Sequence, residues 1–217
     1  MYIHKCVKSS RFFTNRLLEA LRESNSNFIT ISKDIQQDIQ WLLKFIPQFN
    51  GYSQYVKLPV QYMHTIAIDA CLTGVGGVWG NLVYTAQLPE EWVGNSNYNI
   101  NHFEMVNLVV AIRLWGKHWQ HQNVKIYIDN ASVVQVCNTG YTREKFLGAC
   151  IMNIWLHTSI WDINLDVNHI AGYKNKTADI LSRWQHNDNN VIKLHGLVNN
   201  PSWCDVSTEL FHIDSEI

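Results

Sequence analysis

Apolar residues recur along this chain with two different periods, and these periods divide it into a helical part and a mixed part. In residues 1–50, apolar positions three and four residues apart predict two amphipathic helices, which begin near Ser10 and Ser32. Ser32 is a suitable N-cap, and Pro47 is expected to end the second helix because proline cannot donate a backbone hydrogen bond. Two short helices of this kind predict an appendage that docks on a neighbouring domain.

Residues 62–185 alternate between strand and helix patterns. The predicted order is three strands, a helix, a strand, two helices, a strand and a final helix. This order indicates a mixed α/β fold, with a five-stranded sheet that opens with a hairpin meander and has helices on its flanks. Residues 51–61 contain Gly, Ser and Pro and predict a linker, whereas residues 186–217 are expected to form a poorly ordered tail.

The stretch T-G-V-G-G, residues 73–77, follows the first predicted strand. Its glycines are typical of a tight turn, and we expect them to reverse the chain between the first two strands. No predicted helix follows these glycines, which argues against a dinucleotide-binding fingerprint.

Composition narrows the class of protein without naming its chemistry. The 217 residues are 47% hydrophobic and 16% charged, as in an ordinary globular protein with a sizeable core. No apolar run approaches the roughly twenty residues of a membrane span, so no membrane partner is expected. Five scattered cysteines without a C-x-x-C pair predict reduced thiols in an intracellular protein, cytoplasmic or nuclear, and argue against structural zinc. The net charge of −1 does not by itself indicate nucleic-acid binding.

Four acidic residues stand at positions where chemistry is often placed. Asp69 and Asp129 each close a predicted strand, and the carboxyl ends of neighbouring parallel strands meet at one edge of a sheet. Taken singly, each is an ordinary turn aspartate. Asp179 falls early in the last predicted helix, which Asn175 opens, and that placement also fits a capped helix.

Glu104 shares a helix face with apolar residues, so an acid lies at one end of a stripe that faces the core. An alternative is equally specific. With Asn101 as N-cap, Glu104 falls at the third helical position, where a capping-box acid belongs. The sequence alone leaves both roles open.

Several buried carboxylates close together are costly unless cations bridge them. Mg²⁺ prefers carboxylate oxygens and keeps waters for a phosphate and a nucleophile. Two such ions roughly 3.5–4 Å apart clamp the attacking and leaving oxygens in phosphoryl transfer. The four acids therefore predict phosphodiester hydrolysis with two Mg²⁺ ions, for which Mn²⁺ can substitute.

Four motifs resemble the ribonuclease H domain of retroelement reverse transcriptases, most closely that of the DIRS-like tyrosine-recombinase elements. They read I-A-I-D-A-C-L-T-G-V-G-G-V-W-G, I-N-H-F-E-M-V-N-L-V-V-A-I, V-K-I-Y-I-D-N-A-S-V-V and H-I-A-G-Y-K-N-K-T-A-D-I-L-S-R. They span about residues 62–185, and the last is the most specific. Residues 1–50 resemble, more loosely, the connection segment that joins polymerase to nuclease.

The resemblance implies a ribonuclease H-like fold and hydrolysis of the RNA strand of RNA–DNA hybrids, with the polymerase portion as a partner. It assigns the metal-binding and catalytic carboxylates, and the mobile active-site histidine, to Asp69, Glu104, Asp129, Asp179 and His169. Asn130 and Asn175 are further expected to contact the substrate. Cys71 stands where the family often has serine. That departure keeps a second interpretation open, a catalytically inactive domain kept for structure or nucleic-acid binding. A transposase or integrase would lack the closing motif.

Overall fold

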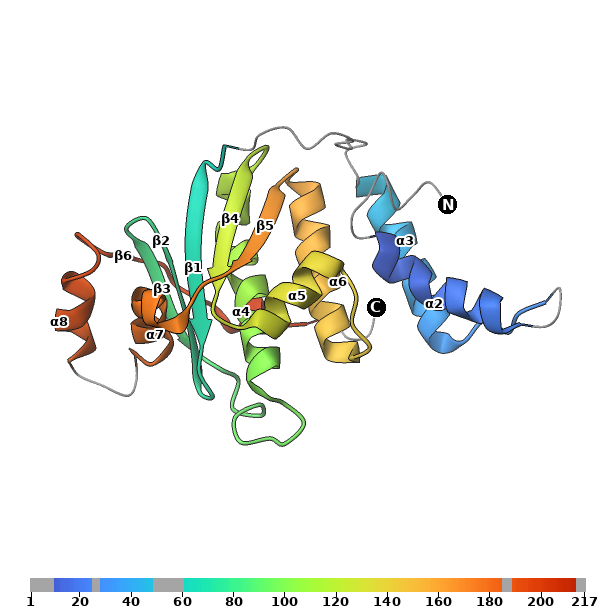
Figure 1. Cartoon of the computed structure of the whole chain (residues 1–217), viewed down its shortest axis with the longest axis horizontal. Coiled ribbons are helices and arrows are strands. Elements are labelled where there is room, and N and C mark those ends of the chain that lie inside the picture. Colours follow the sequence, from blue (N-terminus) through green and yellow to red (C-terminus); the bar gives the residue numbers. More distant parts are fainter. Residues whose placement is uncertain (1–9, 25–27, 49–60, 185–188, 214–217) are drawn as a thin grey trace.

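The computed structural model describes residues 10–24, 28–48, 61–184 and 189–213 (Figure 1). The expected linker falls outside this part of the chain, apart from Gln61. The helices are α2 Ser10–Glu23, α3 Lys33–Phe45, α4 Ile100–Trp115, α5 Ala131–Thr139, α6 Lys145–Ile160, α7 Lys176–Ser182 and α8 Asn190–His195. Short 3-10 turns are η1 Ile46–Gln48, η2 Gly116–Trp119, η3 Gly172–Lys174 and η5 Thr208–Phe211. The strands are β1 His64–Ala70, β2 Gly74–Trp79, β3 Leu82–Gln87, β4 Asn123–Ile128, β5 Asn164–His169 and β6 Ser202–Trp203.

These strands form one mixed sheet in the order β5-β4-β1-β2-β3-β6. The first three strands pair antiparallel as a meander, whereas β4 pairs parallel with both β1 and β5. The predicted mixed α/β sheet flanked by helices is confirmed, with six strands in place of five. None of the helices in the described ranges has the length and apolarity that a membrane span requires.

Helices cover both faces of the sheet. Two adjacent glycines on β2, Gly76 and Gly77, show how closely other residues pack against this strand. A Cβ on Gly76 would lie 2.5 Å from backbone and side-chain atoms of Leu181 in α7. A Cβ on Gly77 would lie 2.5 Å from the ring of Tyr84, which packs toward α4 on the other face. The prediction that these glycines form a turn is therefore wrong. They lie inside β2, where the absence of side chains lets α7 and Tyr84 approach the strand.

The main core lies between the sheet and helices α4, α5 and α6. Helix α4 is buried on nearly all sides, and its contacts with α6 and β1 fix its position against the sheet. This burial explains why α4 can carry polar groups only where they have partners or a cavity to face.

The N-terminal helices α2 and α3 pair with each other, and α3 also contacts α6. Trp41 and Phe45 of α3 form a small cluster with Met152 of α6, and Lys145 pairs with Asp34 at 3.3 Å. Ser32 caps α3 as its side chain accepts a hydrogen bond from the amide of Ile35.

The segment after the last motif is more ordered than expected. Helix α8 packs Leu194 against Val83 and Leu181, and β6 adds a parallel strand beside β3. Phe211 is buried in the main core. Between Asn189 and Ile213 the expectation of a poorly ordered tail is wrong, because scattered apolar residues in an Asn-rich sequence supply enough buried surface to hold it.

Candidate active site

Two of the predicted carboxylates lie on neighbouring parallel strands. Residues of β1 and β4 pair from His64 with Val124 to Ala67 with Tyr127. Continuing that register past the paired residues brings Asp69, near the end of β1, beside Asp129, which directly follows β4. The two strands therefore deliver both acids to the same edge of the sheet, as the strand-end pattern predicts.

Glu104 comes from α4 and reaches the same edge from the other side of β1. It is 2% exposed, and its carboxylate accepts a hydrogen bond from the backbone amide of Ala70. Of the two roles that the sequence leaves open for Glu104, the structure excludes the capping role. Asn99 is the N-cap of α4, and His102 completes the capping box by accepting from the amide of Asn99. The N-cap lies two residues earlier than the expected Asn101, so Glu104 is not at the third helical position and its side chain is free for the site.

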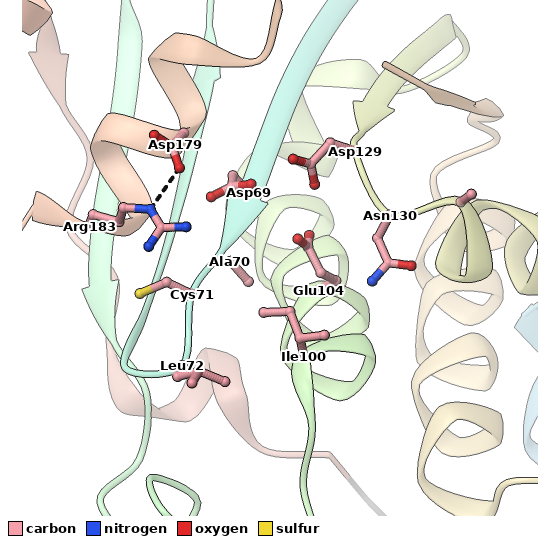
Figure 2. Close-up of a pocket in the computed structure, with 11 residues that line it drawn as sticks. Asp69, Ala70, Cys71, Leu72, Ile100, Glu104, Asp129, Asn130, Asp179 and Arg183 are labelled. Carbon is pink, nitrogen blue, oxygen red and sulfur yellow. Dashed lines mark hydrogen bonds and ion pairs between the residues drawn. The ribbon is translucent and has the colours of Figure 1, made fainter. Parts of the chain in front are cut away.

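Asp69, Glu104 and Asp129 form a compact group, and one carboxylate oxygen from each lies within 4.8 Å of the others. Figure 2 shows these three side chains turned toward one another. They line a cavity of about 660 Å³, together with residues of β1, α4, α5 and α7. The structure thus brings acids from three separate elements to one place.

Asp179 lines the same cavity from α7. Among the described residues, however, it does not belong to the group of three acids whose oxygens lie within 4.8 Å of one another. Its Oδ1 accepts a hydrogen bond at 2.7 Å from Nε of Arg183, one turn later on the helix (Figure 2). Both side chains are about half exposed, so this ion pair is weak and can be exchanged for another partner.

Burial raises the pKa of the Asp69 carboxyl to about 7. A hydrogen bond donated by Ser182 at 2.5 Å opposes the rise, whereas the charges of Asp129 and Asp179 add to it. Burial raises the pKa of Glu104 further, to about 9, and the charges of Asp69 and Asp129 contribute to that rise. The site therefore holds more negative charge than its own hydrogen bonds can stabilise.

This excess of charge fits divalent cations. Among the described residues, Oε2 of Glu104 is buried and has no hydrogen-bond partner. The carboxylates of Asp69 and Asp129 lie close to that of Glu104. Carboxylate oxygens are the ligands that Mg²⁺ and Mn²⁺ prefer, and a cation would stabilise the ionised forms that burial disfavours. Asp69, Glu104 and Asp129 are thus the residues able to hold one, with Asp179 at the rim of the same cavity.

His169 is exposed at the end of β5, beside Asp129. Its Nε2 lies 3.1 Å from the carbonyl oxygen of Asp129, and because a carbonyl only accepts, this nitrogen carries the proton. The following segment also approaches the site: a Cβ on Gly172 would lie 3.1 Å from Oδ2 of Asp129. The histidine of the last motif thus contacts the backbone of Asp129, and its glycine borders the Asp129 carboxylate.

The two asparagines expected at the substrate have their side chains committed to the fold. Asn130 caps α5 by accepting from the amides of Ser132 and Val133, and its Nδ2 donates to Asn101. Asn175 is buried, and its Nδ2 donates at 2.9 Å to the carbonyl oxygen of Ile68. The prediction that Asn175 caps α7 through its side chain is wrong, since the amide instead anchors α7 to β1. Asn130 borders the cavity, whereas little of Asn175 is open to a substrate.

Ser182 is a site residue that the sequence reasoning missed. It is buried at the end of α7, where its hydroxyl meets Asp69 and its carbonyl oxygen accepts a hydrogen bond from Sγ of Cys71 at 3.1 Å. The closing motif contains this serine, but nothing in the spacing indicates that it turns back onto β1. Cys71, the departure from the family pattern, therefore contacts α7.

Comparison of the sequence with known proteins identifies no relative of this chain. No protein family and no curated protein matches the chain. Among solved structures, the ribonuclease H1 of the halophilic archaeon Halobacterium salinarum is 14% identical, with a TM-score of 0.46 over 54% of this chain and 92% of that one. A foamy viral protease-reverse transcriptase in complex with double-stranded DNA is 8% identical, with a TM-score of 0.37 over 78% of this chain. The match covers 32% of that viral protein. Because both similarities are remote, we base the function on the carboxylate geometry.

Proposed function

We propose that this chain is a ribonuclease H that hydrolyses the RNA strand of RNA–DNA hybrids, as the nuclease part of a retroelement reverse transcriptase of the DIRS-like type. The observation that carries the proposal is the convergence of Asp69, Glu104 and Asp129 within 4.8 Å. The closing motif supports it, because His169 contacts the backbone carbonyl of Asp129 and Asp179 lines the same cavity as the three acids. In this proposal the helices of residues 1–50 belong to the connection segment.

The proposed cofactor is a pair of Mg²⁺ ions, for which Mn²⁺ can substitute. When bound, such ions activate water for attack on a phosphodiester and stabilise the charge that develops on its oxygens. The role of Asp69 and Asp129 is to hold both positions, while Glu104 completes one and Asp179 the other. Asp179 takes up this role by leaving Arg183, whose guanidinium is then available to a substrate phosphate.

His169 contributes proton handling beside the reacting groups. Its ring is exposed, lies against the Asp129 carbonyl and belongs to the last residue of β5, so it can turn toward a leaving group and away again when the product leaves. The RNA strand is selected through its 2′-hydroxyl groups, and the hybrid is recognised by shape rather than by base sequence. The expected products carry 5′-phosphate and 3′-hydroxyl ends.

The test is cleavage of a labelled RNA–DNA hybrid in Mg²⁺ by the purified chain and by Asp129→Asn. This substitution keeps the volume of the side chain and removes one charge from the group. We expect hydrolysis to be lost while the fold is retained, and the metal-free variant to be at least as stable as wild type because repulsion with Glu104 is relieved. Thermal melting with and without metal measures both effects.

The same experiment decides between this function and a catalytically inactive domain. If the wild-type chain neither cleaves the hybrid in Mg²⁺ or Mn²⁺ nor melts at a higher temperature with metal, the enzymatic proposal fails. Equal cleavage by wild type and Asp129→Asn would indicate a contaminating nuclease.

A further inference from the structure

Helix α4 carries an amide group in the middle of the protein core. Asn107 is 0% exposed, and its neighbours along the helix, Val106 and Leu108, are apolar and fully buried. An amide buried without hydrogen bonds destabilises a fold by about 1–3 kcal/mol, so its position requires an explanation.

Asn107 uses its whole side chain in hydrogen bonds to three strands. Its Nδ2 donates to the carbonyl oxygens of Asp69 at 2.7 Å and Gly76 at 3.0 Å. Its Oδ1 accepts from the hydroxyl of Tyr84 at 2.6 Å. Both amide hydrogens and the amide oxygen are therefore satisfied. Asp69 and Gly76 are partners across β1 and β2, and Tyr84 lies on β3.

Two of the candidate metal ligands depend on this junction for their spacing. Asp69 supplies a carboxylate from the residue whose own carbonyl oxygen Asn107 binds. Glu104 lies three residues before Asn107 on α4, and residues at this spacing share a helix face. One side chain thus links the backbone of one ligand to the helix that carries the other.

When both carboxylates are ionised, as cation binding requires, they repel each other, and this repulsion tends to separate α4 from β1. The hydrogen bonds of Asn107 oppose that separation, because one of them joins α4 to the backbone of Asp69 itself. Their geometry also depends on β2, because the ring of Tyr84 lies over Gly77 and a Cβ there would approach its Cε1 to 2.5 Å. The glycine lets the tyrosine hydroxyl reach the amide, and the tyrosine orients the amide toward Asp69.

We propose that Asn107 is a positioning residue of the candidate metal site, which fixes the distance between the Asp69 and Glu104 carboxylates. This inference rests on the proposed function, since it assigns Asn107 a role toward the same cations. A metal site requires ligands held within about 0.5 Å, and second-layer contacts of this kind typically change metal affinity 10- to 100-fold.

The experiment compares Asn107→Leu with Asn153→Leu in the full chain. Asn153 is the matched control: it is 4% exposed on α6, and its amide is bound to the Ala149 carbonyl oxygen and the Arg113 guanidinium. Mn²⁺ affinity is measured by electron paramagnetic resonance of the free ion, and stability by melting without metal. We expect both variants to melt earlier, and only Asn107→Leu to bind Mn²⁺ about tenfold or more weakly.

Tyr84→Phe provides a second route in case Asn107→Leu does not fold. It removes only the bond that orients the amide, and we expect Mn²⁺ binding to weaken several-fold. Wild-type affinity in whichever of the two variants folds, or an equal loss in Asn153→Leu, overturns the proposal while the metal site stands. Absence of Mn²⁺ binding by the wild-type chain instead overturns the proposed function, and the positioning role with it.

Discussion

The hydroxyl of Ser182 lies 2.5 Å from Oδ2 of Asp69 and ties the end of α7 to the end of β1. The same hydroxyl lies 3.0 Å from the carbonyl oxygen of Asp179. A hydroxyl carries one proton, and an ionised carboxylate is the stronger acceptor, so the bond serves Asp69 when that carboxyl is charged. Ser182 thereby favours the form of Asp69 that a cation requires.

Ser182→Ala is expected to move Mn²⁺ binding to higher pH. The serine bond lowers the pKa of Asp69 against the effect of burial, so its removal raises that pKa above about 7. The pH at half-maximal Mn²⁺ binding should rise by up to about one unit. The control is Thr85→Val, which removes another bond to α7, from Thr85 Oγ1 to the Leu181 carbonyl oxygen. An equal shift in both variants would mean that loosening of α7, and not the contact with Asp69, is responsible.

Without metal, the stability of the chain is expected to fall as the pH rises toward 9. Glu104 has a folded pKa of about 9 against an ordinary 4.5, so the folded state keeps a proton that the unfolded state loses. Where the unfolded state binds fewer protons, stability decreases with pH. Glu104→Gln should flatten this decline and raise the melting temperature at pH 8 by on the order of 5 °C.

The informative range for Glu104 is roughly pH 7.5–9, because it lies above the pKa values of Asp69 and Asp38, which burial raises to about 7 and about 6. Those two groups contribute the same sign at lower pH and remain in the variant. A metal-free wild-type chain that gains stability across the upper range would contradict the prediction.

Gly76→Ala is expected to impair catalysis beyond its effect on stability. The added Cβ would lie 2.5 Å from atoms of Leu181 and Ser182, so α7 must move and carry Asp179 away from the other acids. Overpacking of this kind costs roughly 1–3 kcal/mol. Gly116→Ala is the control, because its Cβ would lie 2.4 Å from the Trp161 ring. Neither Gly116 nor Trp161 belongs to β1, β4 or α7. Stability is measured by denaturation, and hybrid cleavage is measured under conditions in which both variants are folded. Both variants should be less stable than wild type, but only Gly76→Ala should cleave more slowly.

His169→Ala is expected to slow turnover without weakening metal binding. The ring contacts a carbonyl oxygen of Asp129 and no carboxylate oxygen that the structure records, so the metal ligands keep their places. A loss of about 10²-fold or more in turnover suits a lost proton-transfer group. The control is His121→Ala, an exposed histidine paired with Asp162. Mn²⁺ affinity reduced together with turnover would assign His169 a role in holding the acids.

Periodicity and turn chemistry predicted the order of elements from β1 to α7, because apolar spacing reports which face of an element is buried. The strand-end positions of Asp69 and Asp129 also predicted their meeting, since parallel neighbours end at the same edge. Glu104 needed the structure. Its capping role depended on where α4 begins, and Asn99 and Asn101 are equally good caps in sequence.

Long-range hydrogen bonds were beyond the sequence. Ser182 and Asp69 are 113 residues apart, and no local pattern relates a serine at the end of a helix to an acid on the first strand. The glycines of β2 were misplaced for a similar reason. A glycine in the sequence is compatible both with a turn and with a strand that another element approaches closely. Only the packing of α7 and Tyr84 against β2 shows that the second applies here.

The short strand β6 has a consequence for any shortened form of the protein. The amides of Ser202 and Cys204 donate to the carbonyl oxygens of Asn81 and Val83, and so cover the outer edge of β3. A chain cut at the end of the last motif, near residue 185, would leave those carbonyls unpaired along the outer edge of β3. Open edges of this kind recruit strands from other molecules. The C-terminal segment therefore protects the sheet against edge-to-edge aggregation, and a shortened chain that resists aggregation should extend at least to Cys204.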